Sequence, residues 1–192
     1  MKRSALILQI FFFIVIIARG QGKELPKMKL MLGYYGETFT HSGLNAGIEY
    51  YPFQSEKYQM ILASNIGGYF HIRNNTSLFI REQWGQRISF GSGVFIDEFI
   101  GIGYLHQFTH GGDNFRVLPN GAVVKTPDSG SPMIMPSVAI GTGYDFSRKT
   151  NWNIIFFLRP ELFWKAPFNG YYLTHLAINA GIIFKTVKKD EK

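Results

Sequence analysis

The sequence predicts an all-β fold, specifically an eight-stranded antiparallel transmembrane β-barrel with one long extracellular loop. Aromatic residues make up 16% of the 192 residues and glycine contributes 21, a composition that suits twisted strands better than packed helices. Bulky apolar residues alternate with small or polar ones along most of the chain. Past the first twenty residues, no stretch has helical periodicity.

The N-terminal segment, residues 1–20, has the pattern of a secretory signal peptide. Lys2 and Arg3 precede the apolar run SALILQIFFFIVII, and Ala18 and Gly20 occupy the small-residue positions of a cleavage site before Gln21. The apolar run is about 15 residues long, short of the roughly 20 that span a bilayer, so cleavage is favoured over a membrane anchor. The rest of the chain is predicted to comprise a periplasmic N-terminal segment at 21–27, the barrel at 28–186 and a charged C-terminal tail at 187–192.

Charge and cysteine content exclude several classes of function. Removal of residues 1–20 takes away three basic residues and no acid, so the net charge of +7 falls to +4. The basic balance therefore belongs partly to the targeting segment and does not support nucleic-acid binding. The chain has no cysteine, which excludes thiolate metal sites, disulfides, a cysteine nucleophile and the acylated cysteine of a lipoprotein.

Strand and turn signals fill the rest of the chain. Alternation and turn residues together predict eight strands, near 28–40, 44–53, 57–71, 76–90, 93–108, 133–146, 152–165 and 171–186. The connection between the fifth and sixth strands, Thr109 to Pro132, is the long one. Within it RVLPNGAVVK predicts a small hairpin around Asn120 and Gly121, a pair favoured in type I′ turns.

The two faces of the strands indicate which side is buried. In the last strand one face carries Leu176, Ile178 and Ile182, whereas the other carries small, amide and ionisable residues such as Asn179 and Lys185. A small-residue and polar face cannot fill the lumen of a soluble barrel, so the bulky face is assigned to lipid. The polar face then lines the interior, where a charge network is expected among Glu49, Arg81, Arg87, Asp97, Asp145, Arg159, Glu161 and Lys165.

Two acidic residues depart from this division of faces. Glu82 and Glu98 fall on the side assigned to lipid. Each is expected either to lie near a membrane interface or to follow a β-bulge that shifts the local phase of the strand.

The short signatures GIGYLH, GTGYDF and NAGIIF, together with the strand count and alternation, resemble the small outer-membrane β-barrel superfamily. This is the eight-stranded group typified by the OmpA transmembrane domain and OmpX, and the chain also resembles uncharacterised outer-membrane barrel proteins of the Bacteroidota type. The resemblance covers roughly residues 28–186. It implies residence in the outer membrane of a Gram-negative bacterium and contact with outer-membrane lipids and lipopolysaccharide. Many such barrels end on an aromatic residue, whereas Phe184 here is followed by KTVKKDEK.

Strand parity predicts the topology. An even number of strands leaves both mature termini in the periplasm, so the connections after strands one, three, five and seven face outside. The long segment 109–132 is the fifth connection, and this places it on the extracellular side, where long loops of such barrels belong.

Two clusters of residues suggest possible chemistry. In YLHQFTHGGDNF, His106, His110 and Asp113 are residue types that ligate divalent metals, although a solvated loop is the commoner interpretation of such spacing. In THSGLN, His41, Ser42 and Asn45 resemble the His, Ser and Asn grouping of lipid A 3-O-deacylases.

In those enzymes the serine attacks an acyl ester with a histidine as base. That resemblance makes Ser42 a candidate nucleophile and His41 or His106 a candidate base. The spacing departs from the deacylase motif, in which one residue separates His from Ser and Asn comes next, and an ordinary loop turn is the competing interpretation. His71 and His175 are isolated in the sequence, which suits a loop and a lumen residue respectively.

Three classes of function follow. The leading one is a non-enzymatic outer-membrane barrel with a structural, adhesion or surface-recognition role carried by its extracellular loops. The alternatives are a lipid A-modifying barrel enzyme and a small transport barrel, although the lumen of an eight-stranded barrel is generally filled by side chains. No cofactor motif is present in the sequence, no nucleic acid is expected, and no partner protein is specified.

Overall fold

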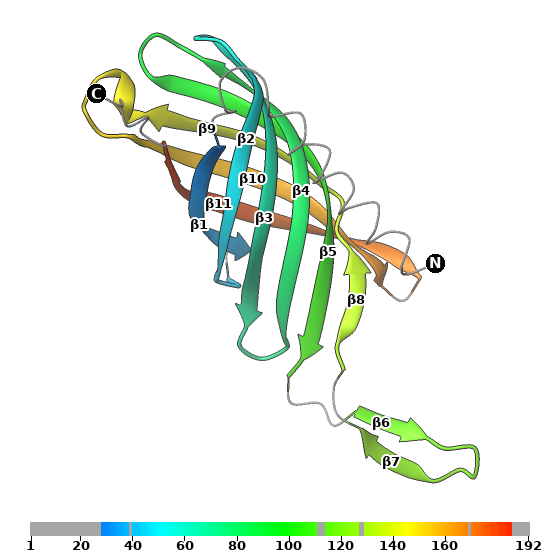
Figure 1. The fold of residues 1–192 in the computed structure, drawn as a ribbon. Helices are drawn as coiled ribbons and strands as arrows, with labels where there is room; N and C mark the ends of the chain where they lie inside the picture. Colours follow the sequence, from blue (N-terminus) through cyan, green and yellow to red (C-terminus); the bar gives the residue numbers. More distant parts are fainter. Residues whose placement is uncertain (1–27, 39, 111–113, 127–128, 169, 186–192) are drawn as a thin grey trace, which may run out of the picture.

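The computed structural model describes residues 28–38, 40–110, 114–126, 129–168 and 170–185. The predicted signal peptide, the segment 21–27 and the tail 187–192 lie outside these residues. Figure 1 shows a tall barrel of strands with a separate hairpin beyond one end. The strands are β1 (Met28–Glu37), β2 (Gly43–Gln54), β3 (Tyr58–His71), β4 (Asn75–Ser89), β5 (Val94–Thr109), β6 (Asn114–Val117), β7 (Val123–Thr126), β8 (Ser131–Ile134), β9 (Ser137–Asp145), β10 (Ile154–Phe168) and β11 (Tyr171–Phe184), with a 3₁₀ turn η1 at Phe146–Arg148.

The barrel is a closed ring of antiparallel strands. β1 to β5 pair in sequence order, β10 pairs with β11, and β11 closes the ring onto β1, with Leu30 opposite Phe184. β8 and β9 both lie between β5 and β10, so they form one interrupted strand and the ring has eight members. The predicted fold class is confirmed.

The interruption between β8 and β9 has a local cause in the sequence. Met135 exchanges backbone hydrogen bonds with Gly103 at 2.8 and 2.9 Å, as a ladder residue does. Pro136 has no N–H to donate, but its carbonyl accepts from the Trp164 N–H at 3.0 Å. The wall is thus continuous through this point, as the single predicted strand 133–146 requires.

The long connection contains the predicted hairpin, with a different turn. β6 and β7 pair from Asn114 opposite Thr126 to Val117 opposite Val123. The Gly121 N–H donates to the Leu118 carbonyl at 2.9 Å, and of the Asn120–Gly121 pair only Gly121 has a positive φ, 81°. A type I′ turn needs positive φ at both residues, so that expectation is wrong. Pro119 favours the ordinary turn because its φ is fixed near −65°.

The two ends of the barrel differ. The β1–β2, β3–β4 and β10–β11 turns lie at the end from which the β6–β7 hairpin projects, here called the arm end (Figure 1). Met28 and Phe184, the first and last strand residues, lie at the opposite end, here called the terminal end, together with η1.

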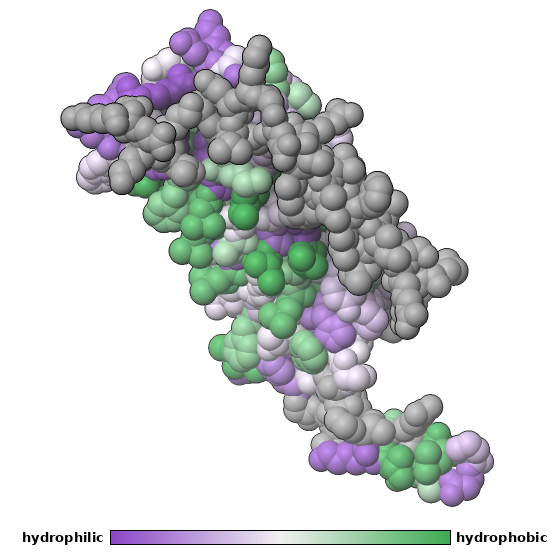
Figure 2. Space-filling view, in the orientation of Figure 1, coloured by the Kyte–Doolittle hydropathy of each residue, from purple (hydrophilic) through white to green (hydrophobic). Residues whose placement is uncertain are grey.

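The wall is apolar outside and polar inside. In β4 the buried positions include Arg81, Gln83 and Arg87, whereas Ile80 and Trp84, at alternating positions, are exposed. Figure 2 shows apolar side chains gathered along the middle of the wall and hydrophilic ones towards the terminal end. In the part of the chain that the structure describes, no helix is long and apolar enough to cross a membrane. The exposed apolar wall identifies the lipid-facing side, because a soluble barrel would bury these side chains.

Glycines on the inner face leave room for large side chains. A Cβ atom placed on Gly141 would lie 2.4 Å from Asp97 Oδ1 and 2.5 Å from Arg159 Cγ. Such distances are far below van der Waals contact, so only glycine lets these two side chains meet beside β9. Small residues on the inner face therefore make room for the large charged side chains that fill the interior.

Candidate functional site: the polar interior and the arm end

A four-residue charge network occupies the interior towards the terminal end. Arg159 Nη2 donates to Glu49 Oε1 at 2.7 Å and to Asp97 Oδ2 at 2.9 Å. Arg87 Nη2 donates to the same Asp97 oxygen at 2.9 Å, and Arg87 lies 3.5 Å from Glu49. All four side chains are at most 3% exposed. The two cations balance the two carboxylates, which is the condition for keeping buried charges inside a protein.

Aromatic rings enclose this network. The Arg87 guanidinium lies 4.1 Å from the ring centre of Phe95, and that of Arg159 lies 4.4 Å from both Phe99 and Phe157. Ring faces attract cations, most strongly where water is excluded. The interior at this level is therefore filled by paired charges and rings.

The other predicted members of the network lie elsewhere. Arg81 and Glu161 form a separate buried ion pair nearer the arm end. Lys165 is buried, and its Nζ donates to the amide oxygen of Gln107 at 3.2 Å. Asp145 does not join these groups, because it is the last residue of β9 and pairs with Lys185 at 2.6 Å at the terminal end.

A carboxylate–histidine cluster lies inside the arm end of the barrel. Glu37, the last residue of β1, is 2% exposed and contacts the Nδ1 atoms of both His41 and His175. Thr38 Oγ1 also donates to Glu37, at 3.0 Å. The His71 ring packs edge-on against His41, with ring centres 3.9 Å apart. We call these residues, Glu37, His41, His71 and His175, the mouth cluster.

Glu37 determines what the histidines can do. A carboxylate only accepts, so both imidazoles carry a proton on Nδ1 and present Nε2 as the remaining group. His175 Nε2 and His71 Nδ1 are buried and have no hydrogen-bond partner among the described residues. Orientation of an imidazole by a carboxylate is also the arrangement that prepares a histidine to act as a base.

The structure does not bring the catalytic candidates together. His41 is turned towards Glu37 inside the barrel, whereas Ser42 is exposed and next to it in the chain. His106 lies on the outer face of β5, where its Nδ1 contacts the Tyr104 hydroxyl at 2.7 Å and its Nε2 the Ser129 carbonyl at 3.0 Å. Among the described residues neither His41 nor His106 makes a hydrogen bond to Ser42, and both ring nitrogens of His106 have other partners, so these residues do not form the arrangement of a deacylase.

The two histidines among the metal candidates each have other partners. His110 Nε2 contacts the Thr76 hydroxyl at 2.7 Å, and His106 makes the two contacts just described. Asp113 lies outside the described residues. Within the described ranges, no group of three or more His, Cys, Asp and Glu residues is arranged to hold a metal ion.

Sequence reasoning missed the mouth cluster. Its members come from β1, the β1–β2 turn, β3 and β11, and His41 and His175 are 134 positions apart in the chain. The sequence signal for this cluster is the alternation of inner and outer faces along each strand. It places Glu37, His71 and His175 on the inner face, towards the arm end of their strands. The alternation alone does not say which of these residues meet, because their contact depends on the closure of the ring, which places β11 beside β1.

The β6–β7 hairpin presents an apolar face. Opposite residues of an antiparallel pair share a face, so Phe115, Val117, Val123 and Lys125 lie on one side. Phe115, Val117 and Val123 are each more than 60% exposed. Val124 lies on the other side and is less exposed, at 36%. A two-stranded hairpin of this length has no core of its own to cover these side chains.

Comparison with known proteins gives the fold. No protein-family model matches the sequence, and no curated protein matches it. Among solved structures, the Neisserial surface protein A, NspA, is similar with a TM-score of 0.55 and 11% identity, over 83% of this chain and 95% of that chain. Ail of Yersinia pestis has a TM-score of 0.46 at 10% identity, over 83% and 99% of the two chains. The N-terminal β-barrel domain of Pseudomonas aeruginosa OprF has a TM-score of 0.41 at 17% identity, over 82% and 97%.

Ring closure, the apolar wall and the polar interior define a transmembrane β-barrel of eight strands. Its fold is that of the small outer-membrane β-barrels, as the likeness to NspA shows. The likeness confirms the barrel fold that the sequence resemblance implies, and an outer-membrane location in a Gram-negative bacterium agrees with this fold.

Proposed function

We propose that this outer-membrane barrel serves in surface recognition, and that the β6–β7 hairpin is the extracellular arm that binds. The observation that carries this proposal is the apolar face of the arm, Phe115, Val117 and Val123, exposed beyond the end of the barrel. Exposed apolar groups gathered on one face are typical of binding surfaces. Loops held on a rigid scaffold are also where recognition usually resides.

The filled interior supports recognition over transport. Arg87 and Arg159 are paired with Asp97 and Glu49 across the lumen, and the aromatic rings of Phe95, Phe99 and Phe157 occupy the same level. Ions or solutes would have to displace buried, paired groups to pass. The barrel therefore acts as a rigid support for the arm.

The orientation rests on chain parity. Met28 and Phe184 lie together at the terminal end, and short turns join the strands there. In outer-membrane barrels, short turns face the periplasm and long connections face outside. The arm end, which carries the long connection, is accordingly the extracellular one in this proposal.

The test compares two substitutions on opposite faces of the arm. The triple variant Phe115→Ser, Val117→Ser, Val123→Ser removes the apolar face, and Val124→Ser is the control on the other face. Producing cells are measured for binding to immobilised lipopolysaccharide and to cultured-cell monolayers. We expect the triple variant to lose binding to at least one of these probes, to the level of a barrel in which residues 112–127 are replaced by a Gly-Ser turn.

Folding is checked in each variant by the mobility shift of unheated barrel on a gel. The control should bind as the natural chain does. If the natural chain and the armless barrel bind equally to both probes, the arm only caps the barrel and the recognition function is wrong.

A further inference from the structure

The outer wall carries a set of polar residues on three adjacent strands. They are Ser64 on β3, Glu82 and Gln86 on β4, and Glu98 on β5, here called the polar stripe. Each lies at an outward position: Glu82, for example, lies between Arg81 and Gln83, which are both buried inside. The stripe therefore faces the lipid side of the barrel.

Neither a β-bulge nor a position near the membrane interface, the two reasons expected from the sequence, explains why Glu82 faces outward. Pairing of β4 with β3 and β5 runs in unbroken register through Ser64, Glu82 and Ile102, so no bulge shifts the phase. Glu82 is also the midpoint of β4, Asn75–Ser89, rather than a residue near a membrane interface. Glu98 lies nearer the start of β5 and fits the interfacial position better.

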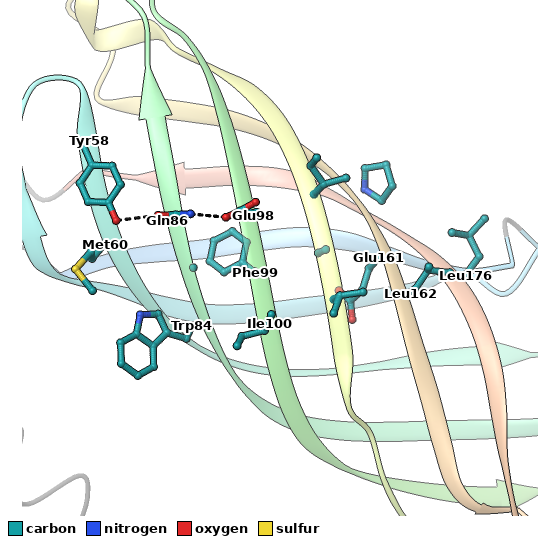
Figure 3. Close-up of a pocket in the computed structure, with 15 residues that line it drawn as sticks. Tyr58, Met60, Trp84, Gln86, Glu98, Phe99, Ile100, Glu161, Leu162 and Leu176 are labelled. Atoms are coloured by element: carbon teal, nitrogen blue, oxygen red, sulfur yellow. Dashed lines mark hydrogen bonds between the residues drawn. The ribbon is translucent and has the colours of Figure 1, made fainter.

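Hydrogen bonds within the stripe satisfy only part of its polar capacity. Ser64 Oγ donates to Glu82 Oε2 at 2.6 Å. The Tyr58 hydroxyl donates to Gln86 Oε1 at 2.8 Å, and Gln86 Nε2 donates to Glu98. Figure 3 shows the second chain of contacts on the wall of a hollow that Trp84 and Ile100 border. Ser64 supplies a donor to Glu82, but a carboxyl group in hydrocarbon is neutral and has an O–H of its own to donate.

The opposite wall has a different composition. β11 lies four strands from β4 in the ring. The outward residues of the central part of β11 and of its neighbours β10 and β1 are apolar, including Leu32, Leu158 and Ile182. Polar groups in a lipid-facing wall are costly, and their restriction to one side indicates that this side is covered by protein.

We propose that the polar stripe is the surface through which two copies of this chain associate in the plane of the membrane. A neutral carboxyl group offers one donor and one acceptor, and the Gln86 amide offers both as well. Such groups are self-complementary, so the same patch on a second copy satisfies them across a two-fold axis. Hydrogen bonds between protein chains are worth making in lipid because water does not compete for the same groups.

The experiment uses the absence of cysteine from the chain, since a single introduced cysteine forms a disulfide only between chains. Ile102→Cys places a thiol beside Glu82 in the register, and Ile182→Cys is the control on the outer face of β11. The variants are refolded into lipid vesicles at low protein density and oxidised. We expect a disulfide-linked dimer from Ile102→Cys and none from Ile182→Cys.

A second substitution tests the chemistry of the stripe. Adding Glu82→Leu to Ile102→Cys should lower the dimerisation constant roughly tenfold, which corresponds to about 1.4 kcal/mol. Glu82→Gln should preserve dimerisation because an amide is also self-complementary. Gln86→Leu provides an independent loss of hydrogen bonding if Glu82→Leu fails to show the gel shift of a folded barrel.

Equal cross-linking from the two walls would overturn the proposal, as would undiminished cross-linking in both leucine variants. Exclusive capture of a different chain by Ile102→Cys in producing cells would also overturn it, because the occupant would then not be a second copy.

Discussion

Replacement of Arg159 by methionine tests the interior network most directly. Arg159 is the cation that contacts both Glu49, at 2.7 Å, and Asp97, at 2.9 Å. Without it, Arg87 is the one ion-pair partner within 4 Å that the two buried carboxylates keep among the described residues, while Lys29 acts on Glu49 only at longer range. Loss of one partner from a buried ion pair costs about 3–5 kcal/mol. Methionine keeps much of the side-chain volume between Phe99 and Phe157, so the loss should be electrostatic rather than a cavity effect.

The assay is urea unfolding of the barrel in lipid vesicles, followed by tryptophan fluorescence and by the gel shift of the folded form. The free energy of unfolding should fall by about 3–5 kcal/mol for Arg159→Met. Adding Asp97→Asn to Arg159→Met removes one of the two carboxylates, so that Glu49 and Arg87 balance each other. The double variant should therefore recover part of the lost free energy of unfolding. Arg73→Met, in the exposed β3–β4 turn, is the control and should change stability by less than about 0.5 kcal/mol. A change within about 1 kcal/mol for Arg159→Met would refute the reasoning that the paired charges are buried and depend on each other.

Three further outcomes are expected. The mature chain should begin at Gln21 by mass measurement and remain in the membrane pellet after alkaline carbonate extraction; its release as a soluble monomer would contradict the lipid-facing wall. Protease added to intact cells should cut within 109–132 and leave the barrel protected, whereas cutting only after the outer membrane is opened would reverse the assigned orientation. Gly141→Val should destabilise the barrel by about 1–3 kcal/mol in the same unfolding assay, because its side chain meets Asp97 and Arg159; wild-type stability would show that the interior has spare room.

The sequence predicts the barrel well because its physical signal is local. Strand alternation has a period of two and depends only on neighbouring residues, so the eight strands and their lipid-facing sides follow from single segments. The predicted strand 57–71 matches β3, Tyr58–His71, and the predicted strand 171–186 matches β11, Tyr171–Phe184, each within two residues. The turn at Asn120–Gly121 was predicted wrongly because Pro119, one residue earlier, has its own backbone preference, which competes with that of the pair.

Pairing between distant strands is the part that the sequence does not encode locally. Asp145 and Asp97 both fall on inner faces, but only the stagger of the strands places Asp97 beside Arg159 and leaves Asp145 with Lys185 at the terminal end. The same stagger, with ring closure between β11 and β1, brings His175 to Glu37. The alternation of faces along a strand therefore predicts that a charged residue lies inside the barrel. The stagger between neighbouring strands then determines how deep that residue lies and which residue it pairs with. Interior charged residues that lie at the same height along the barrel axis are therefore the ones that can pair. Glu37 with His41 and His175 shows that residues from opposite ends of the chain can meet at one height.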